Sequence, residues 1–136
     1  DLVRLFPDLM QFPSEVRTGE LYLDGNILCT PEESGVKDRR RLSFGGLIAC
    51  SVVVDSRGSV VSGPTLNIEG LPVVEDDDDS VEDLVRSVVQ GALKSIPPKR
   101  RADPEIVESA LHRAIRAEVN AWWGKKPNVM VFVHRI

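Results

Sequence analysis

The sequence predicts an α+β fold in which two helices cover one face of a small β-sheet of about three strands. Three observations predict it. A β-branched hairpin pattern lies in the middle of the chain, two amphipathic helical patterns follow, and an apolar run at residues 128–134 reads as the last strand. The order is therefore hairpin, helix, helix, strand, preceded by an extended linker. The last strand can pair with either arm of the hairpin, and the sequence leaves both pairings open.

The predicted hairpin turns at Asp55–Gly58, where Gly58 suits a positive φ. Residues 47–54 before the turn are apolar at odd and even positions alike, so this strand is expected to be buried on both faces or to lie centrally. Residues 59–62 return as the second arm. Gly63-Pro64 weakens the far end of this arm and favours an edge position or a bulge. Residues 67–74 are interpreted as extended but irregular.

Two helices are predicted to follow. The first begins after the N-cap Ser80 and stops at Pro97-Pro98. Lys99–Arg101 then forms a basic loop. The second helix begins at Asp103, with proline at its first position, and ends at Gly124. The apolar residues of this second helix recur at helical spacing, and its predicted core face consists of Val107, Leu111, Ile115, Val119 and Trp122.

The N-terminal part of the chain is predicted to be separate from the compact domain. Residues 1–6 read as a strand, and residues 7–19 as a connector that needs a partner surface, because a free linker is rarely this apolar. A short strand at residues 20–24 is expected to turn at Gly25-Asn26 and to return through residues 27–29.

We place residues 30–41 on the surface and interpret Gly45-Gly46 as a tight turn into the first strand of the domain. The sequence thus divides into residues 1–40, the end of an upstream core with its linker, and residues 41–136, a C-terminal α/β domain. Because the chain opens on Asp1 with a strand pattern, we expect it to be a fragment of a longer protein.

Composition restricts the classes of function. The formal net charge of −4 argues against wholesale binding of nucleic acid through the global field. Two cysteines do not make a disulfide framework, and Cys50 is interpreted as a buried small hydrophobe. Without a signal peptide pattern or an apolar run long enough to cross a bilayer, the chain is expected to be cytoplasmic and to have no membrane partner.

The sequence offers no catalytic or metal-binding constellation. His112 is interpreted as a solvated partner of Glu108, four residues earlier on the polar side of the second helix, and His134 as an exposed residue at a strand end. Neither a His-x-His spacing nor a Cys-x-x-Cys pair occurs. The acidic run at residues 75–79 lacks the pattern of a calcium loop and is interpreted as a solvated loop before a helix.

Two basic clusters remain as candidate contacts with RNA phosphates or with the rest of a parent protein. The first consists of Lys37, Arg39, Arg40 and Arg41, and the second of Lys94, Lys99, Arg100 and Arg101. No aromatic residues interleave with them, so base stacking is not indicated. A candidate interface is the pair Trp122-Trp123, in which Trp123 either covers the core margin or joins a partner.

Four segments, in order, resemble bacterial ribonuclease J. Residues 38–48 match a D-R-x-x-L-(A/S)-x-x-G segment that enters a hairpin, and residues 19–25 match a G-x-(V/L)-Y-x-D-G stretch of the linker. Residues 117–136, with Trp-Gly-Lys-Lys-Pro before the closing strand, resemble the family's C-terminal ending. Residues 1–6 resemble the last strand of its metallo-β-lactamase core.

The resemblance implies a parent enzyme that is a metal-dependent hydrolase with 5′-to-3′ exonuclease and endonuclease activity. Its zinc ligands come from a His-x-His-x-Asp-His motif in the metallo-β-lactamase core, and its β-CASP insertion helps to hold RNA. Neither motif occurs here, so no catalytic residue, metal ligand or cofactor is carried over to this chain. The implied role is non-catalytic support of RNA processing and degradation, through dimer or higher oligomer assembly and support of the upstream nuclease core.

The sequence departs from the family pattern in two places. Residues 44–46 read Phe-Gly-Gly where many relatives have Asp before Gly, and the acidic run at 75–79 is not expected of the family.

Overall fold

The computed structural model describes residues 19–74 and 80–136. The chain divides into two compact units, residues 1–39 and residues 40–136. The strand predicted at 1–6, the connector predicted at 7–19 (apart from Gly19) and the acidic run at 75–79 lie outside the described residues.

In the first unit, the predicted hairpin is confirmed. Strands β1 (Tyr22–Asp24) and β2 (Ile27–Cys29) pair antiparallel, and Gly25 takes a φ of 62° in the turn between them. An exposed ion pair of 2.9 Å joins Arg39 Nη1 to Asp24 Oδ2. A two-stranded hairpin of this length is marginally stable by itself, because it buries little apolar surface.

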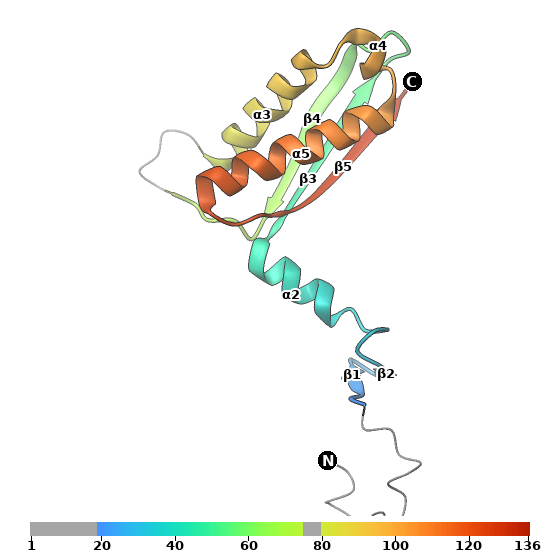
Figure 1. Cartoon of the computed structure of the whole chain (residues 1–136), viewed down its shortest axis with the longest axis vertical. Coiled ribbons are helices and arrows are strands. Elements are labelled where there is room, and N and C mark those ends of the chain that lie inside the picture. Colours follow the sequence, from blue (N-terminus) through green and yellow to red (C-terminus); the bar gives the residue numbers. More distant parts are fainter. Residues whose placement is uncertain (1–18, 75–79) are drawn as a thin grey trace, which may run out of the picture. The chain divides into compact units, whose positions relative to one another are not determined.

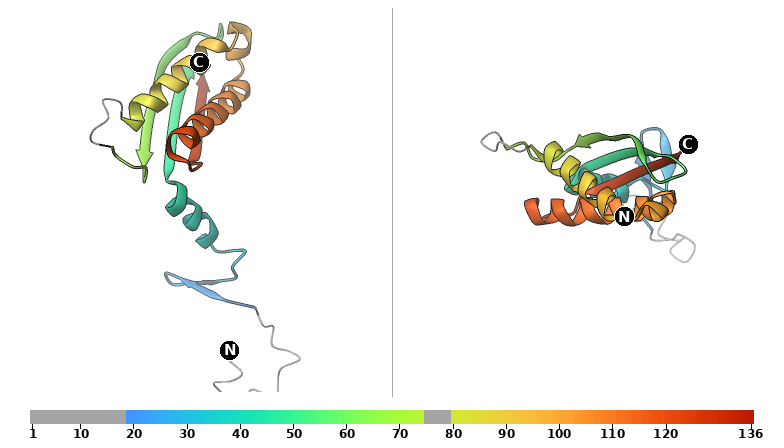
Figure 2. Two further views of the ribbon diagram at one scale, coloured as in Figure 1. Left: turned by 60° about the vertical axis from the view of Figure 1, so that its left-hand side comes forward. Right: turned by 90° about the horizontal axis from the view of Figure 1, so that it is seen from above.

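The second unit is a mixed three-stranded sheet with helices on one face, which confirms the predicted fold class (Figures 1 and 2). Its strands are β3 (Leu47–Val54), β4 (Val60–Glu69) and β5 (Asn128–Arg135), in the order β4-β3-β5. The strand β3 lies at the centre, paired antiparallel with β4 and parallel with β5. This decides the pairing of the last strand that the sequence left open.

Helices α3 (Val81–Ser95) and α5 (Pro104–Trp123) cover one face of this sheet. Every second residue of β3 is buried beneath them, and both helices contribute a buried row. The core consists of Ile48, Cys50, Val52, Val54, Val85, Val89, Leu93, Ile96, Val107, Leu111, Ile115, Val119 and Val131. Alternate residues of β3 and helix residues spaced three or four apart thus form one apolar layer. The predicted burial of Cys50 is confirmed.

The predicted helix ends are also confirmed. Ser80 Oγ accepts a hydrogen bond of 3.1 Å from the backbone N–H of Asp83, which satisfies a free donor in the first turn of α3. In the same way, Asp103 Oδ1 accepts a bond of 3.1 Å from the N–H of Glu105. Gly124 ends α5 with a φ of 82°, in the left-handed region that favours glycine.

Local structure differs from prediction in two places, and a helix that was not predicted is present in a third. No residue from 30 to 41 is buried, as predicted, and helix α2 (Val36–Gly45) includes the basic run at residues 37–41. The basic loop predicted at Lys99–Arg101 is part of a one-turn helix, α4 (Pro98–Arg101). The second hairpin arm does not end near Gly63-Pro64 but continues as β4 to Glu69, so part of the segment described as irregular is a regular strand.

The strand β4 passes Gly63-Pro64 because it lies at the edge of the sheet. The ladder with β3 shifts register between Ser51 and Val53, opposite this point, and the peptide bond before Pro64 is cis. A strand at the edge has a neighbour on one side only, so a residue without a backbone N–H, such as proline, can be placed there without losing a hydrogen bond between strands. The predicted edge or bulge at Pro64 is thus confirmed, although the predicted weakening of the strand is not.

Candidate functional site

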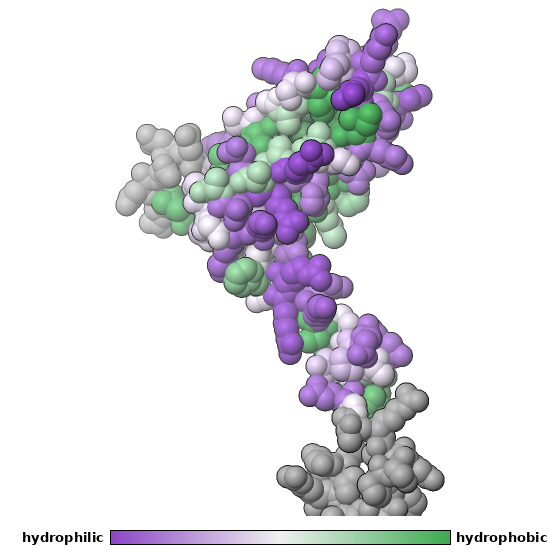
Figure 3. Space-filling model, viewed as in Figure 1, coloured by the Kyte–Doolittle hydropathy of each residue, from purple (hydrophilic) through white to green (hydrophobic). Residues whose placement is uncertain are grey.

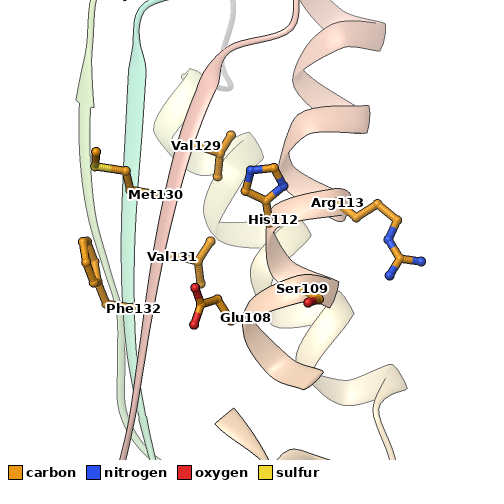
Figure 4. A pocket seen from close by; sticks show the side chains of 8 residues that line it. All are labelled: Glu108, Ser109, His112, Arg113, Val129, Met130, Val131 and Phe132. Carbon is orange, nitrogen blue, oxygen red and sulfur yellow. The ribbon is translucent and has the colours of Figure 1, made fainter. Parts of the chain in front are cut away.

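A shallow groove of about 480 Å³ runs between α5 and β5. In Figure 4, Glu108 and His112 project from α5 toward the strand, while Val129 and Val131 point from β5 toward the helix. Met130 and Phe132 point to the other side of the sheet. Both Glu108 and His112 are exposed, as predicted for a solvated pair. The groove therefore consists of a polar helix face beside an apolar strand.

The two histidines lie on different elements, His112 on α5 and His134 near the end of β5, and both are exposed. Within residues 19–74 and 80–136, no group of three or more His, Cys, Asp or Glu side chains lies close enough to hold a metal ion. The side chains described here therefore do not fit the zinc site that the resemblance implies for the parent enzyme.

Cys50 is the one described group for which the structure indicates a clear shift in pKa. Burial raises the pKa of its thiol from 9.0 to about 11, and the positive charge of Arg86 opposes this rise. A thiol with a raised pKa is a poor nucleophile, because the thiolate is the reactive form. Cys50 therefore acts as a core residue.

The first basic cluster lies on α2. Its candidate residues Lys37, Arg39, Arg40 and Arg41 are all exposed. Arg39 is engaged with Asp24, and the backbone carbonyl of Arg41 accepts a hydrogen bond of 3.0 Å from Asn128 Nδ2. This cluster is accessible to a partner, although Asp24 partly neutralises it.

The second basic cluster divides into accessible and structural residues. Lys94, Lys99 and Arg100 are exposed around the end of α3 and α4. Arg101 is half-buried, and its Nη1 donates a hydrogen bond of 3.4 Å to the carbonyl of Leu93. Arg101 thus ties α4 to the last turn of α3, and sequence reasoning had no signal for this difference among neighbouring basic residues.

A second hollow, of about 500 Å³, borders this cluster beside α4 and α5. Arg100 and Arg113 line it together with the carboxylates of Asp103 and Glu105. Opposite charges at one hollow reduce the positive potential that a phosphate would meet. The helix side of this unit, seen in Figure 3, carries many hydrophilic side chains with apolar patches between them.

The two tryptophans at the end of α5 have different surroundings. Trp123 packs against the core, which agrees with one of the two alternatives predicted for it, whereas Trp122, predicted on the apolar face, is partly buried and is not among the residues packed against the core. The buried row of this helix advances by four residues, from Val107 through Val119, and the next position in that row is 123. Lys125 Nζ lies 5.0 Å from the centre of the Trp123 ring and 4.4 Å from that of Phe44. This cation–π stack joins the end of α2 to the loop after α5.

Large apolar side chains are exposed at two places that the sequence analysis did not single out. On the hairpin of the first unit, Leu21, Leu23, Ile27 and Leu28 are exposed. On the open face of the sheet, Met130 is 51% and Phe132 is 50% exposed. The alternation of β5, whose valines face the helices, was the signal that could have identified this second place.

Comparison with known proteins identifies the family. Residues 34–136 match the model of the family described as the ribonuclease J C-terminal domain. The chain belongs to this family.

Two curated relatives agree with this membership. Ribonuclease J of Sinorhizobium meliloti is 38% identical over 136 residues, which are 100% of this chain and 24% of the relative. Ribonuclease J of Corynebacterium glutamicum is 26% identical over 121 residues, 88% of this chain and 16% of the relative. The chain thus spans about a quarter or less of the length of these relatives.

No helix within the described residues is long and apolar enough to span a membrane.

Proposed function

We propose that this chain is a non-catalytic part of a ribonuclease J that supports oligomer assembly and the activity of a metal-dependent nuclease core elsewhere in the same polypeptide. In this proposal, RNA hydrolysis and the zinc site belong to the core, and the enzyme acts in the cytoplasm as an exo- and endoribonuclease. Membership of the ribonuclease J C-terminal domain family supports the placement of this chain within a ribonuclease J. The apolar hairpin β1–β2 supports the assembly role.

The hairpin β1–β2 supports the assembly role because its apolar side chains are exposed and do not form a core of their own. Leu23 and Leu28 are direct cross-strand neighbours and are 72% and 64% exposed. Leu21, which directly precedes β1, is also exposed. An exposed apolar cluster on a hairpin that is marginally stable alone is typical of a surface that a partner covers.

Sedimentation tests the assembly role. We expect the full-length ribonuclease J that contains this chain to form a dimer or higher oligomer, and a form without residues 20–136, which include the hairpin, to dissociate and to lose RNA cleavage. Leu23→Ser with Leu28→Ser should weaken assembly in the full-length protein. Glu20→Ser, which changes an exposed polar residue just before the hairpin, is the control and should leave the sedimentation coefficient unchanged.

The assembly role fails if the 136-residue chain stays monomeric at high concentration and removal of residues 20–136 leaves the parent oligomer intact. A second measurement tests the non-catalytic role. The purified chain should show no RNA hydrolysis with zinc, magnesium or manganese, and cleavage that copurifies with it would contradict the proposal.

A second candidate function is RNA binding through the basic clusters. The observation that favours it is the exposure of Lys94, Lys99 and Arg100 within seven positions of the chain. Acidic side chains at the neighbouring hollow reduce its positive potential, so this function ranks second. Replacing Lys99 and Arg100 with Ala should then weaken RNA binding and flatten its salt dependence. Unchanged affinity in the parent protein would assign these residues to the general surface.

A further inference from the structure

The open face of the sheet, which lies opposite α3 and α5, has two chemically different halves. The register pairs Ser51 of β3 with Thr65 of β4 and with Phe132 of β5, and all three side chains point away from the helices. One position along each ladder, Ala49 lies between Asn67 and Met130. By the same alternation, Asn128 and His134 share this face of β5 with Met130 and Phe132. The β4 half is thus polar, and the β5 half is apolar in its middle.

The apolar half coincides with the parallel pair of strands. Met130 and Phe132 are half-exposed, and Leu47 and Val53 of β3 are partly exposed beside them. Sheets made only of parallel strands are covered on both faces, whereas a mixed sheet such as this one can keep one face open. Within residues 40–136, the described helices α3 and α5 cover one face only. The open face therefore presents Met130 and Phe132 as neighbouring exposed apolar side chains, the kind of patch that marks an interaction site.

The area of this face favours a covalently linked occupant. Three strands spaced about 4.8 Å apart, with eight residues rising about 3.3 Å each, present roughly 370 Å² of projected area. A stable complex between separate proteins buries about 800 Å² on each partner. The accessible area of a three-stranded face exceeds its projection, but one face this small lies at the low end of such interfaces, and a shared polypeptide raises the effective concentration of its occupant. Most of the length of the matching relatives lies outside this chain, which spans 24% of one of them.

We propose that the open face of β3 and β5, centred on Met130 and Phe132, docks on an apolar surface elsewhere in the same ribonuclease J polypeptide. This inference rests on the proposed function, because it needs the chain to be part of a longer enzyme. The docked surface presents apolar side chains to Met130 and Phe132 and polar side chains to Thr65 and Asn67. It is a contact within one polypeptide, separate from the hairpin to which the oligomer contact is assigned.

Hydroxyl-radical footprinting tests this docking. The oxidation rate of Met130 is measured by mass spectrometry in the 136-residue chain and in the full-length ribonuclease J that contains it. Because Met130 is 51% exposed in the chain, and the core of an interface is packed as densely as a protein interior, oxidation should slow several-fold in the full-length protein. Ile106, which lies on the helix side and is 38% exposed, is the internal control and should keep its rate.

Three results would overturn the docking. Equal oxidation of Met130 in both proteins shows an open face. An equal fall at Ile106 shows protection that is not specific to the sheet. Protection in the 136-residue chain that increases with its concentration assigns the face to a second copy. Each result is independent of whether removal of residues 20–136 disrupts the oligomer, so failure of the docking and failure of the assembly role are distinguishable.

A pair of variants strengthens the test. Phe132→Thr should return the Met130 oxidation rate in the full-length protein to that of the 136-residue chain, because it removes the ring beside Met130 and keeps a good strand former. Asn67→Thr, on the polar half, should leave the protection in place. If Phe132→Thr leaves the Met130 rate of the full-length protein unchanged, the docking is wrong.

Discussion

The side-chain amide of Asn128 donates a hydrogen bond of 2.7 Å to the carbonyl oxygen of Gly46. The same Nδ2 atom lies 3.0 Å from the carbonyl oxygen of Arg41. One amide at the start of β5 therefore satisfies acceptors at the end of α2 and at the entry to β3. A Cβ at Gly45 would lie 2.7 Å from the carbonyl oxygen of Lys126, so the backbones meet closely here.

Asn128→Ala should lower the free energy of unfolding by about 0.5–1.5 kcal/mol, because the carbonyl oxygens of Arg41 and Gly46 lose the side-chain donor, although that of Gly46 keeps the backbone N–H of Asn128. Urea unfolding of the 136-residue chain measures this loss. Asn67→Ala, at an exposed position of β4, is the matched control and should cost less than about 0.5 kcal/mol. Equal losses in the two variants would contradict a special role for Asn128.

Ile115→Ala should lower the free energy of unfolding by about 2–5 kcal/mol, since Ile115 is fully buried between α5 and the sheet and its truncation leaves a cavity. Ile106 lies on the same helix and is partly exposed. Ile106→Ala is therefore the control and should cost about 1 kcal/mol or less. Thermal and urea unfolding should rank the two variants in this order.

Gly58→Ala should lower the free energy of unfolding by more than about 2 kcal/mol. Gly58 has a φ of 82°, and a Cβ at this position would clash with the carbonyl group of Pro98 on α4. Gly91→Ala on α3 meets no neighbour within 4 Å and should stabilise the chain by up to about 1 kcal/mol. Opposite signs for these two identical substitutions would confirm the close approach of the hairpin turn to α4.

Stability should fall at alkaline pH because of Cys50. Its thiol has a pKa raised from 9.0 to about 11 by burial, so the folded state keeps the proton that the unfolded state loses above pH 9. The contribution is complete below pH 9, decreases as pH rises toward 11, and amounts to about 2–3 kcal/mol once lost. Cys50→Ala should show a flatter decline in unfolding free energy between pH 8 and pH 11. The idea fails if both proteins decline equally.

Much of the second unit was predictable, because strand alternation, helix spacing and capping residues agree there. The pattern from Leu47 to Val54, the cap at Ser80 and the stop at Gly124 are local signals, and each has the predicted structure. The parallel pairing of β3 with β5 was not predictable. It depends on where two helices place the last strand, and the composition of β5 suits either neighbour.

Helix α2 was missed because it lacks an apolar stripe. Within Val36–Gly45 the buried residue is Gly45, and the middle of the helix is a run of charged side chains. Tryptophan placement failed for another reason, since positions 122 and 123 are both compatible with one helical face until the exact row is known. The roles of Met130 and Phe132 depend on which face of the sheet the helices cover, and sequence alone did not determine this.

The hydrogen bond from Asn128 to Gly46 spans 82 residues. Because β3 pairs with β5 only after this long separation, the ribosome must release the last strand before the sheet is complete. Until then, the hairpin β3–β4 has an unpaired edge on its most apolar strand, which is the kind of edge that promotes aggregation. Slow synthesis of the segment between β4 and β5 would prolong this exposed state, so yield in cells should depend on the codons of that segment and on chaperones.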